Sequence, residues 1–119
     1  MNIFAIEKTY DNKIDWIKSA QSQDNYRVVK MILESCQMLC TNLNYLHDYK
    51  ISPYRSCHVN HPSTKWARES SGNFERLIEH TYALIDEYGV RFGKTHKCEA
   101  VLDKVVDIYD ASMFQKHVE

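Results

Sequence analysis

Residues 25–47, NYRVVKMILESCQMLCTNLNYLH, carry the most regular apolar pattern in the chain. The apolar side chains recur at helical spacing and, at about 100° per residue, cover more than half of the helix circumference. A helix this apolar is typical of the middle of a helical bundle. The polar remainder is a narrow row that must face water or a shared polar pocket. That row consists of Lys30, Glu34, Gln37 and Thr41.

Three further segments have helical periodicity. We predict a short helix that carries residues 14–20, a long helix over 64–92 and a last helix over 97–115. Residues 1–10 have the pattern of an extended arm or an edge strand. Both prolines lie in residues 48–63, which we predict to be the one long loop.

The helix ends have recognisable signals. Asp11 or Asn12 suits the cap of the short helix, Asp24 or Asn25 suits the cap of the next, and Ser63 suits the cap of the second long helix. Gly93 is a candidate C-cap. The run Ser70-Ser71-Gly72 weakens the second long helix and predicts a kink there, since a glycine inside a helix costs about 1 kcal/mol relative to alanine.

Composition supports a small helical protein. The 119 residues are 44% hydrophobic, with only 3 glycines and 2 prolines, too few turn formers for a many-stranded sandwich or barrel. We predict an all-α fold: one domain over residues 1–119, a compact bundle of three or four helices with one long loop. No apolar run approaches the roughly 18 residues of a membrane span and no basic leader precedes one, so we expect a cytoplasmic protein that does not enter membranes.

The charges are balanced overall but unevenly distributed. The net charge is −1, yet residues 50–97 carry eight positive and five negative groups and four of the six histidines. An anionic partner would therefore dock on this middle part. We expect the four cysteines to be reduced and predict no metal site. The group Cys57, His58, His61, His96 and Cys98 lacks the two-residue spacing of a zinc knuckle.

The second long helix has an unusual polar row beside its apolar face, made of Glu69, Asn73, His80, Glu87 and Arg91. If this row faces the polar row of residues 30–41 across the bundle, the two enclose a groove with carboxylates, an amide, an imidazole and cations. Such a groove suits acid–base catalysis or nucleotide binding. The alternative is structural, with Lys30–Glu34 and Glu87–Arg91 as simple ion pairs one helical turn apart.

A second candidate is the loop motif Asn60-His61-Pro62, followed by Trp66 and Arg68. A histidine held by the following proline at a helix start, with Arg68 nearby, suits phosphate binding. The alternative is that Asn60 and His61 cap the helix while Trp66 fills the core.

Three strings resemble a group of small bacteriophage proteins. They are NYRVVKMILESCQMLCT (25–41), NHPSTKWARESSGNFERL (60–77) and ALIDEYGVRFGKTHK (83–97). Patterns such as RVVKMxLExxQxL, NHPxxxWxRES and EYxxRxGKxHK recur in that group in this order. The resemblance covers the middle two-thirds of the chain and implies a phage origin. It also implies that the charged, polar and aromatic residues in these patterns act together, while Gly72 departs from the alanine-like residue usual there.

The segment YKISP (49–53), the histidines after it and the long helix are similar in order to the phage pyrimidine-dimer DNA glycosylase, endonuclease V. Tyr26-Arg27 also resembles a step in that enzyme's catalytic helix. The similarity implies a helical fold and a glycosylase-like action on DNA. The chain departs from that enzyme at Asn2, which disfavours removal of the first methionine, and at Val28, which replaces an acidic residue.

Two functional hypotheses follow. In the first, the protein binds a nucleotide or nucleic acid in the polar groove and acts on it, with Glu34, Glu87 and His61 as the catalytic groups and no cofactor. The substrate-binding residues are then Lys30, Gln37, Trp66, Arg68, Asn73, Arg91, Lys94 and His96. In the second, the protein is a non-enzymatic phage protein that binds and modulates a host factor, supported by the acidic tail Asp103, Asp107, Asp110 and Glu119. Apolar residues exposed on the last helix would favour this second hypothesis.

Overall fold

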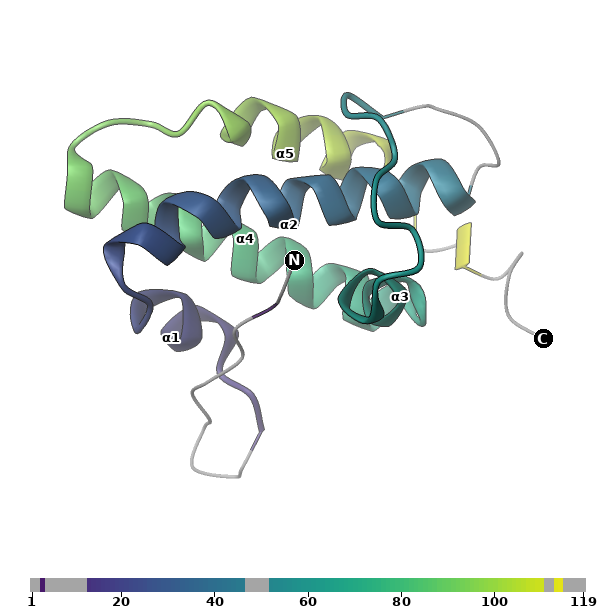
Figure 1. The fold of residues 1–119 in the computed structure, drawn as a ribbon, viewed down its shortest axis with the longest axis horizontal. Coiled ribbons are helices and arrows are strands. Elements are labelled where there is room, and N and C mark those ends of the chain that lie inside the picture. Colours follow the sequence, from purple (N-terminus) through teal and green to yellow (C-terminus); the bar gives the residue numbers. More distant parts are fainter. Residues whose placement is uncertain (1–2, 4–12, 47–51, 111–112, 115–119) are drawn as a thin grey trace.

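The computed structural model describes residues 3, 13–46, 52–110 and 113–114. These residues form five α-helices and no strand, which confirms the all-α prediction (Figure 1). The helices are α1 (Trp16–Gln21), α2 (Asn25–Leu46), α3 (Pro62–Arg68), α4 (Ser71–Phe92) and α5 (Cys98–Ile108). None of the described helices has the length and apolar character needed to cross a membrane.

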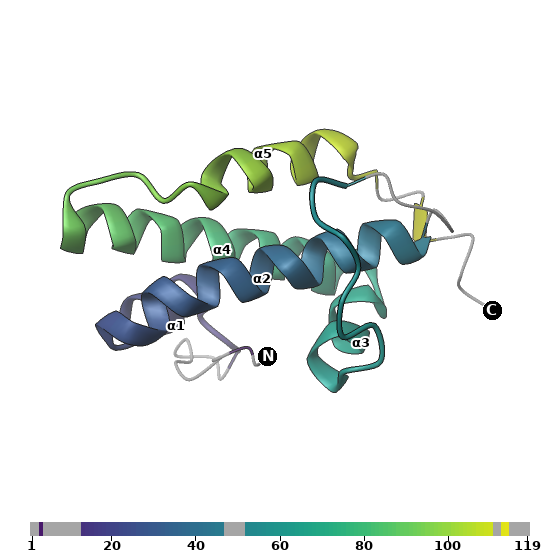
Figure 2. The same cartoon turned by 45° about the horizontal axis from the view of Figure 1, so that its top comes forward.

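The two long helices, α2 and α4, pack against each other and form the centre of the molecule. Helix α5 packs on both of them along one side, while α1 and α3 lie on the opposite side (Figure 2). The core between these helices includes Ile32, Leu39, Phe74, Leu84 and Leu102, all fully buried.

Helix α2 is the element that the sequence predicted best. It begins at Asn25, and Asp24 Oδ1 accepts a hydrogen bond from the Arg27 amide at 2.8 Å, so the predicted cap at Asp24 is confirmed. Thirteen of its side chains are buried. The cap predicted for α1 is wrong: Asp15, immediately before the helix, accepts from the Lys18 amide at 2.9 Å, and residues 11 and 12 lie outside the described part of the chain.

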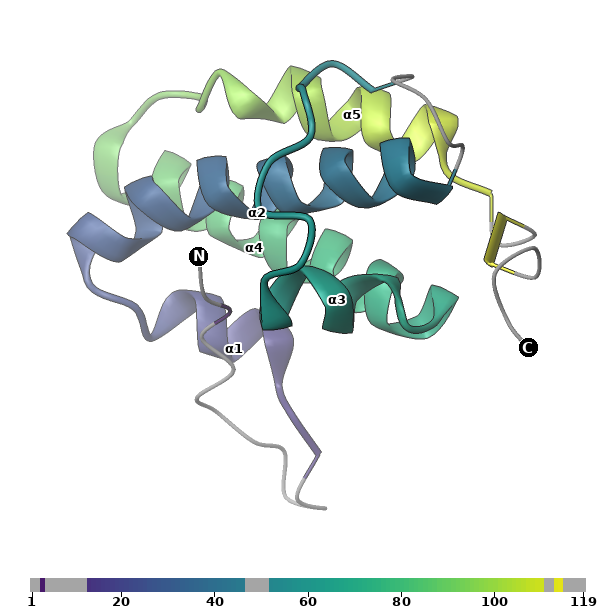
Figure 3. The same cartoon turned by 45° about the vertical axis from the view of Figure 1, so that its right-hand side comes forward.

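The single helix predicted over residues 64–92 is wrong, because two helices occupy this stretch. His61 caps α3 and Pro62 occupies its first turn, in place of the predicted cap at Ser63. The chain leaves the helix after Arg68, and Ser70 caps α4 by accepting from the Asn73 amide at 3.0 Å. The predicted kink at residues 70–72 is therefore a full break between helices, which turns α3 away from the axis of α4 (Figure 3).

The last helix is shorter than predicted. Gly93 caps α4 with a left-handed φ of 67°, as expected, and α5 begins at Cys98. The helix stops before Tyr109, whose ring stacks on Phe74 with centroids 5.0 Å apart. Beyond it, Met113 and Phe114 are buried in the core, and the Phe114 ring also contacts Phe74. The helix that we predicted as far as residue 115 therefore ends at Ile108.

Residues 52–61 form no helix or strand and cross over α2 (Figure 3). Polar side chains of α2 bind this segment: Thr41 Oγ1 donates to the Cys57 carbonyl at 3.1 Å and accepts from its amide at 3.0 Å. Asn44 accepts from the Ser52 amide and donates to the Tyr54 carbonyl, both at 3.1 Å. These bonds satisfy main-chain groups that no helix satisfies and hold the segment that leads into α3.

Candidate functional site

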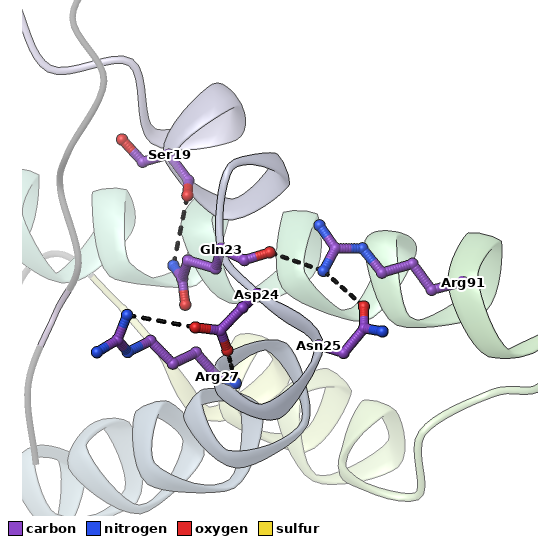
Figure 4. A network of polar contacts seen from close by, with 6 residues as sticks. All are labelled: Ser19, Gln23, Asp24, Asn25, Arg27 and Arg91. Atoms are coloured by element: carbon purple, nitrogen blue, oxygen red, sulfur yellow. Dashed lines mark hydrogen bonds and ion pairs between the residues drawn. The ribbon is translucent and has the colours of Figure 1, made fainter.

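Arg91, a predicted substrate-binding residue, is fully engaged within the protein. Its Nε donates to Glu87 Oε1 at 2.8 Å, and each side chain of this ion pair is only about one-fifth exposed. Its terminal nitrogens donate to the main-chain oxygen of Gln23 at 2.7 Å and to Asn25 Oδ1 at 3.1 Å (Figure 4). They also donate to the main-chain oxygen of Gln21 at 2.8 Å. Arg91 therefore fastens the connection between α1 and α2 to the end of α4.

His80, from the same predicted row, is 1% exposed. Its Nδ1 lies 2.9 Å from the Trp16 carbonyl oxygen, which can only accept, so Nδ1 carries the proton. The other ring nitrogen then accepts from the Gln23 side-chain amide at 3.5 Å. Burial lowers the pKa of His80, which keeps the ring neutral. His80 joins α4 to α1 rather than lining a groove.

The polar row of α2 faces away from this network. Helical geometry places Lys30, Glu34 and Gln37 opposite the fully buried Ile32 and Leu39. Lys30 is exposed and its ammonium lies 5.6 Å from the ring centroid of Tyr26. Glu34 and Gln37 are partly buried. The two polar rows therefore do not face each other, and the groove that we predicted between them does not form.

Arg68 and Asn73 connect helices. Arg68 donates to the Val59 carbonyl at 2.6 Å and to Asn42 Oδ1 at 3.3 Å, and its guanidinium lies 4.2 Å from the ring centroid of Tyr45. Asn73 donates to the Trp66 carbonyl at 2.9 Å, across the break between α3 and α4. Glu69, the remaining member of the predicted row, is an exposed residue at the end of α3.

His61 and His96 each accept a hydrogen bond from a main-chain amide at the start of a helix. His61 Nδ1 accepts from the Ser63 amide at 3.2 Å and His96 Nδ1 accepts from the Cys98 amide at 3.0 Å, each at the start of a helix. His96 is also buried against the ring of Tyr88, at a centroid distance of 4.9 Å. The predicted catalytic groups Glu34, Glu87 and His61 thus belong to three separate parts of the structure.

A hollow of about 320 Å³ opens between α1 and α3, and both tryptophans of the chain line it. Trp16 and Trp66 lie with ring centroids 5.5 Å apart and planes at 35°. Ile3, Ile14, Pro62 and Ser63 complete the lining. Trp66 was a predicted site residue. Trp16 was placed in a helix but not in a site, because no periodicity or spacing pairs two residues from separate helices.

The segment that leads into and forms α3 is cationic. From residue 52 to residue 68 there is no aspartate or glutamate, whereas Arg55, Lys65 and Arg68 are positive. Arg55, His58 and Lys65 are exposed. His58 has a φ of 52°, the one positive φ of a non-glycine residue in the described part of the chain; its carbonyl accepts from the His61 amide at 3.1 Å in the turn before α3.

The remaining predicted residue, Lys94, lines a different hollow at the turn between α4 and α5. Among the described residues, no group of three histidine, cysteine, aspartate or glutamate side chains is arranged to hold a metal ion. Cys36 and Cys98 are buried, and burial raises the pKa of the Cys36 thiol.

Compared with protein-family models, curated proteins and solved structures, the chain matches none. The proposed function below therefore rests on the geometry of the site.

Proposed function

We propose that the protein binds single-stranded nucleic acid, with an unpaired base in the hollow lined by Trp16 and Trp66 and the phosphates along residues 52–68. The observation that carries this proposal is the position of both tryptophans at one hollow, beside a segment that contains the exposed cations Arg55 and Lys65 and no carboxylate.

The aromatic part supports binding of bases. Stacking of a base on an aromatic side chain contributes about 1–3 kcal/mol and tolerates any sequence. The two indole rings are partly buried, come from different helices and are held by the core: Trp66 packs against it, and His80 binds the carbonyl of Trp16. The hollow volume of about 320 Å³ lies at the lower end of the range for small-molecule sites.

The cationic part supports binding of the backbone. Lys65 is exposed and directly precedes Trp66 on α3, and Arg55 and His58 are exposed on the segment that leads into this helix. Exposed cations attract phosphate and release counterions on binding, so affinity should fall as salt rises. Arg68 and Arg91 do not have this role in the proposal because each donates to a main-chain oxygen inside the protein.

The proposal is binding without catalysis. The glycosylase-like action implied by the resemblance to the phage pyrimidine-dimer DNA glycosylase depends on a free N-terminal amine, and the first residue lies outside the described residues. Glu87, one of the predicted catalytic groups, is held in an ion pair by Arg91.

The test is the affinity for a fluorescein-labelled 15-nucleotide oligothymidine, measured by anisotropy at several salt concentrations. Lys65→Glu should weaken binding and lower the slope of log affinity against log salt by about 0.7 or more. Lys104→Glu is the matched control, since Lys104 is an exposed lysine on α5, and it should bind like the unchanged protein. Equal loss in both variants, or no binding by the unchanged protein, would refute the proposal. Duplex DNA and mononucleotides as competitors distinguish the other ligand classes.

A further inference from the structure

A second hollow, of about 380 Å³, lies between α1 and α4, and its floor is apolar. Ile17 of α1 is 48% exposed and Val90 of α4 is 81% exposed, and both line it together with Ala83 and the ring of Tyr82. Single exposed apolar side chains are common, but two from different helices that converge on one hollow mark an interaction surface.

This hollow continues along α4. Asp86 and Val90 also line the neighbouring hollow of about 570 Å³, which reaches the turn at Gly93 and Thr95. Val90 therefore lies between two adjoining hollows. We call these two hollows together the Val90 groove.

Carboxylates surround the Val90 groove. Glu79 and Asp86 line it from α4, and Glu99 lines its far end from α5. Asp103 of α5 accepts a hydrogen bond of 2.6 Å from the Tyr82 hydroxyl. Burial and these α5 carboxylates raise the pKa of Tyr82.

Few cations offset this charge. Arg76 pairs with Glu79 at 3.6 Å, but both side chains are about half exposed, and such a pair is weak and screened by salt. Glu87 is neutralised by Arg91 on the border with α1. Lys94 is the cation that lines the far end of the groove. The groove thus combines an apolar floor with an acidic rim.

We propose that the Val90 groove binds an amphipathic helix of a partner protein, with apolar side chains on the groove floor and lysine or arginine residues facing the carboxylates. Helix-in-groove recognition uses apolar anchors at i, i+3, i+4 and i+7 against such a floor. Complementary charge at the rim steers the encounter and excludes acidic partners. Nucleic acid and anionic lipid are repelled by the same carboxylates, so this groove is separate in chemistry and position from the tryptophan hollow.

The probe is a fluorescein-labelled 18-residue peptide of leucine and lysine with the leucines on one helical face, measured by anisotropy. Val90→Ser should weaken binding on the order of tenfold, because the buried apolar contact is lost. Val106→Ser, an exposed valine on α5 outside the groove, is the matched control and should leave binding unchanged. Asp86→Lys should also weaken binding of the peptide, and it should reduce the dependence of peptide affinity on salt concentration. All three positions are exposed, and circular dichroism melting confirms that each variant folds.

The proposal would be overturned by no binding of the leucine–lysine peptide, by equal binding to the Val90→Ser variant, by tighter binding of a leucine–glutamate peptide of the same pattern, or by displacement of the peptide by oligothymidine. Self-association of the protein that is lost in Val90→Ser would also overturn it, since a second copy would then occupy the groove. The experiment is independent of the tryptophan hollow, because the Lys65→Glu variant should bind the peptide with the same affinity as the unchanged protein.

Discussion

His80 Nδ1 lies 2.9 Å from the main-chain oxygen of Trp16, and the two rings meet edge to face with centroids 5.6 Å apart. This contact joins the middle of α4 to the first residue of α1. It also positions the Trp16 ring, which lines the tryptophan hollow in contact with the Trp66 ring at a centroid distance of 5.5 Å. The buried core and the surface site are therefore linked through one imidazole.

His80→Leu should lower the free energy of unfolding by about 1–3 kcal/mol, because the Trp16 carbonyl and the Gln23 amide lose a buried partner. Urea unfolding followed by circular dichroism measures the change. Glu79→Gln, at the neighbouring exposed position, should change stability little. Full stability of His80→Leu would show that this hydrogen bond does not hold α1.

Stability should decrease as the pH falls below about 6.5. Burial lowers the folded-state pKa of His80 below its ordinary value of 6.5, and the pKa of His96 is lowered in the same way. The unfolded chain therefore binds more protons than the folded chain in this range, and acid favours unfolding. Above pH 6.5 the histidines are neutral in both states, and this loss of stability is absent. Thermal melting at pH 7.5 and 5.5 tests this. His80→Leu should reduce the pH dependence, whereas His58→Gln, which changes an exposed side chain, should retain it.

Arg91→Ala should destabilise the protein by about 2 kcal/mol, because a charged donor to two main-chain oxygens of the α1–α2 connection is lost. Oligothymidine affinity, measured at a temperature where the variant is folded, should stay the same. Arg76→Ala removes an exposed arginine of the same helix and should change neither quantity. A loss of affinity at unchanged stability would instead support a binding site at the Glu87–Arg91 pair.

One thiol should react rapidly in the folded protein. Cys57 is partly buried, whereas Cys36, Cys40 and Cys98 are buried, and burial raises the pKa of Cys36 and Cys40 and so suppresses their thiolate forms. A chromogenic thiol reagent should modify one cysteine in buffer and all four in urea. Cys57→Ser should abolish the rapid phase; rapid modification of more than one thiol would mean that the α2–α5 contact opens readily.

The helical content and the position of α2 could be predicted from the sequence, because a wide apolar arc and a capping aspartate are local signals. The break between α3 and α4 could be predicted only in part. Ser70 and Gly72 indicated a weak point, but these residues also suit a kink within one helix. The apolar pattern continues on both sides of Ser70, and this continuity favoured a single helix over a new helix capped by Ser70. The end of α5 depends on the stacking of Tyr109 on Phe74, a contact between distant segments.

The candidate site was less accessible to sequence analysis. The helical wheel that grouped Glu69 with Arg91 assumed one continuous helix, and the break after Arg68 removes Glu69 from it. Charge spacing on a helix also does not tell a ligand-binding arginine from one whose donors are satisfied internally, as those of Arg91 are. The tryptophan hollow arises from α1 and α3 meeting through contacts with α4, which only tertiary packing determines.

The most direct test of the tryptophan hollow is fluorescence titration of two single-tryptophan variants, Trp16→Phe and Trp66→Phe, with unlabelled oligothymidine. Because the chain contains only these two tryptophans, each variant reports on one of the two rings. A base that stacks on this contacting pair in the hollow should quench both variants, with dissociation constants that agree with the anisotropy measurement. Binding detected by anisotropy without quenching in either variant would contradict the account and place the nucleic acid elsewhere.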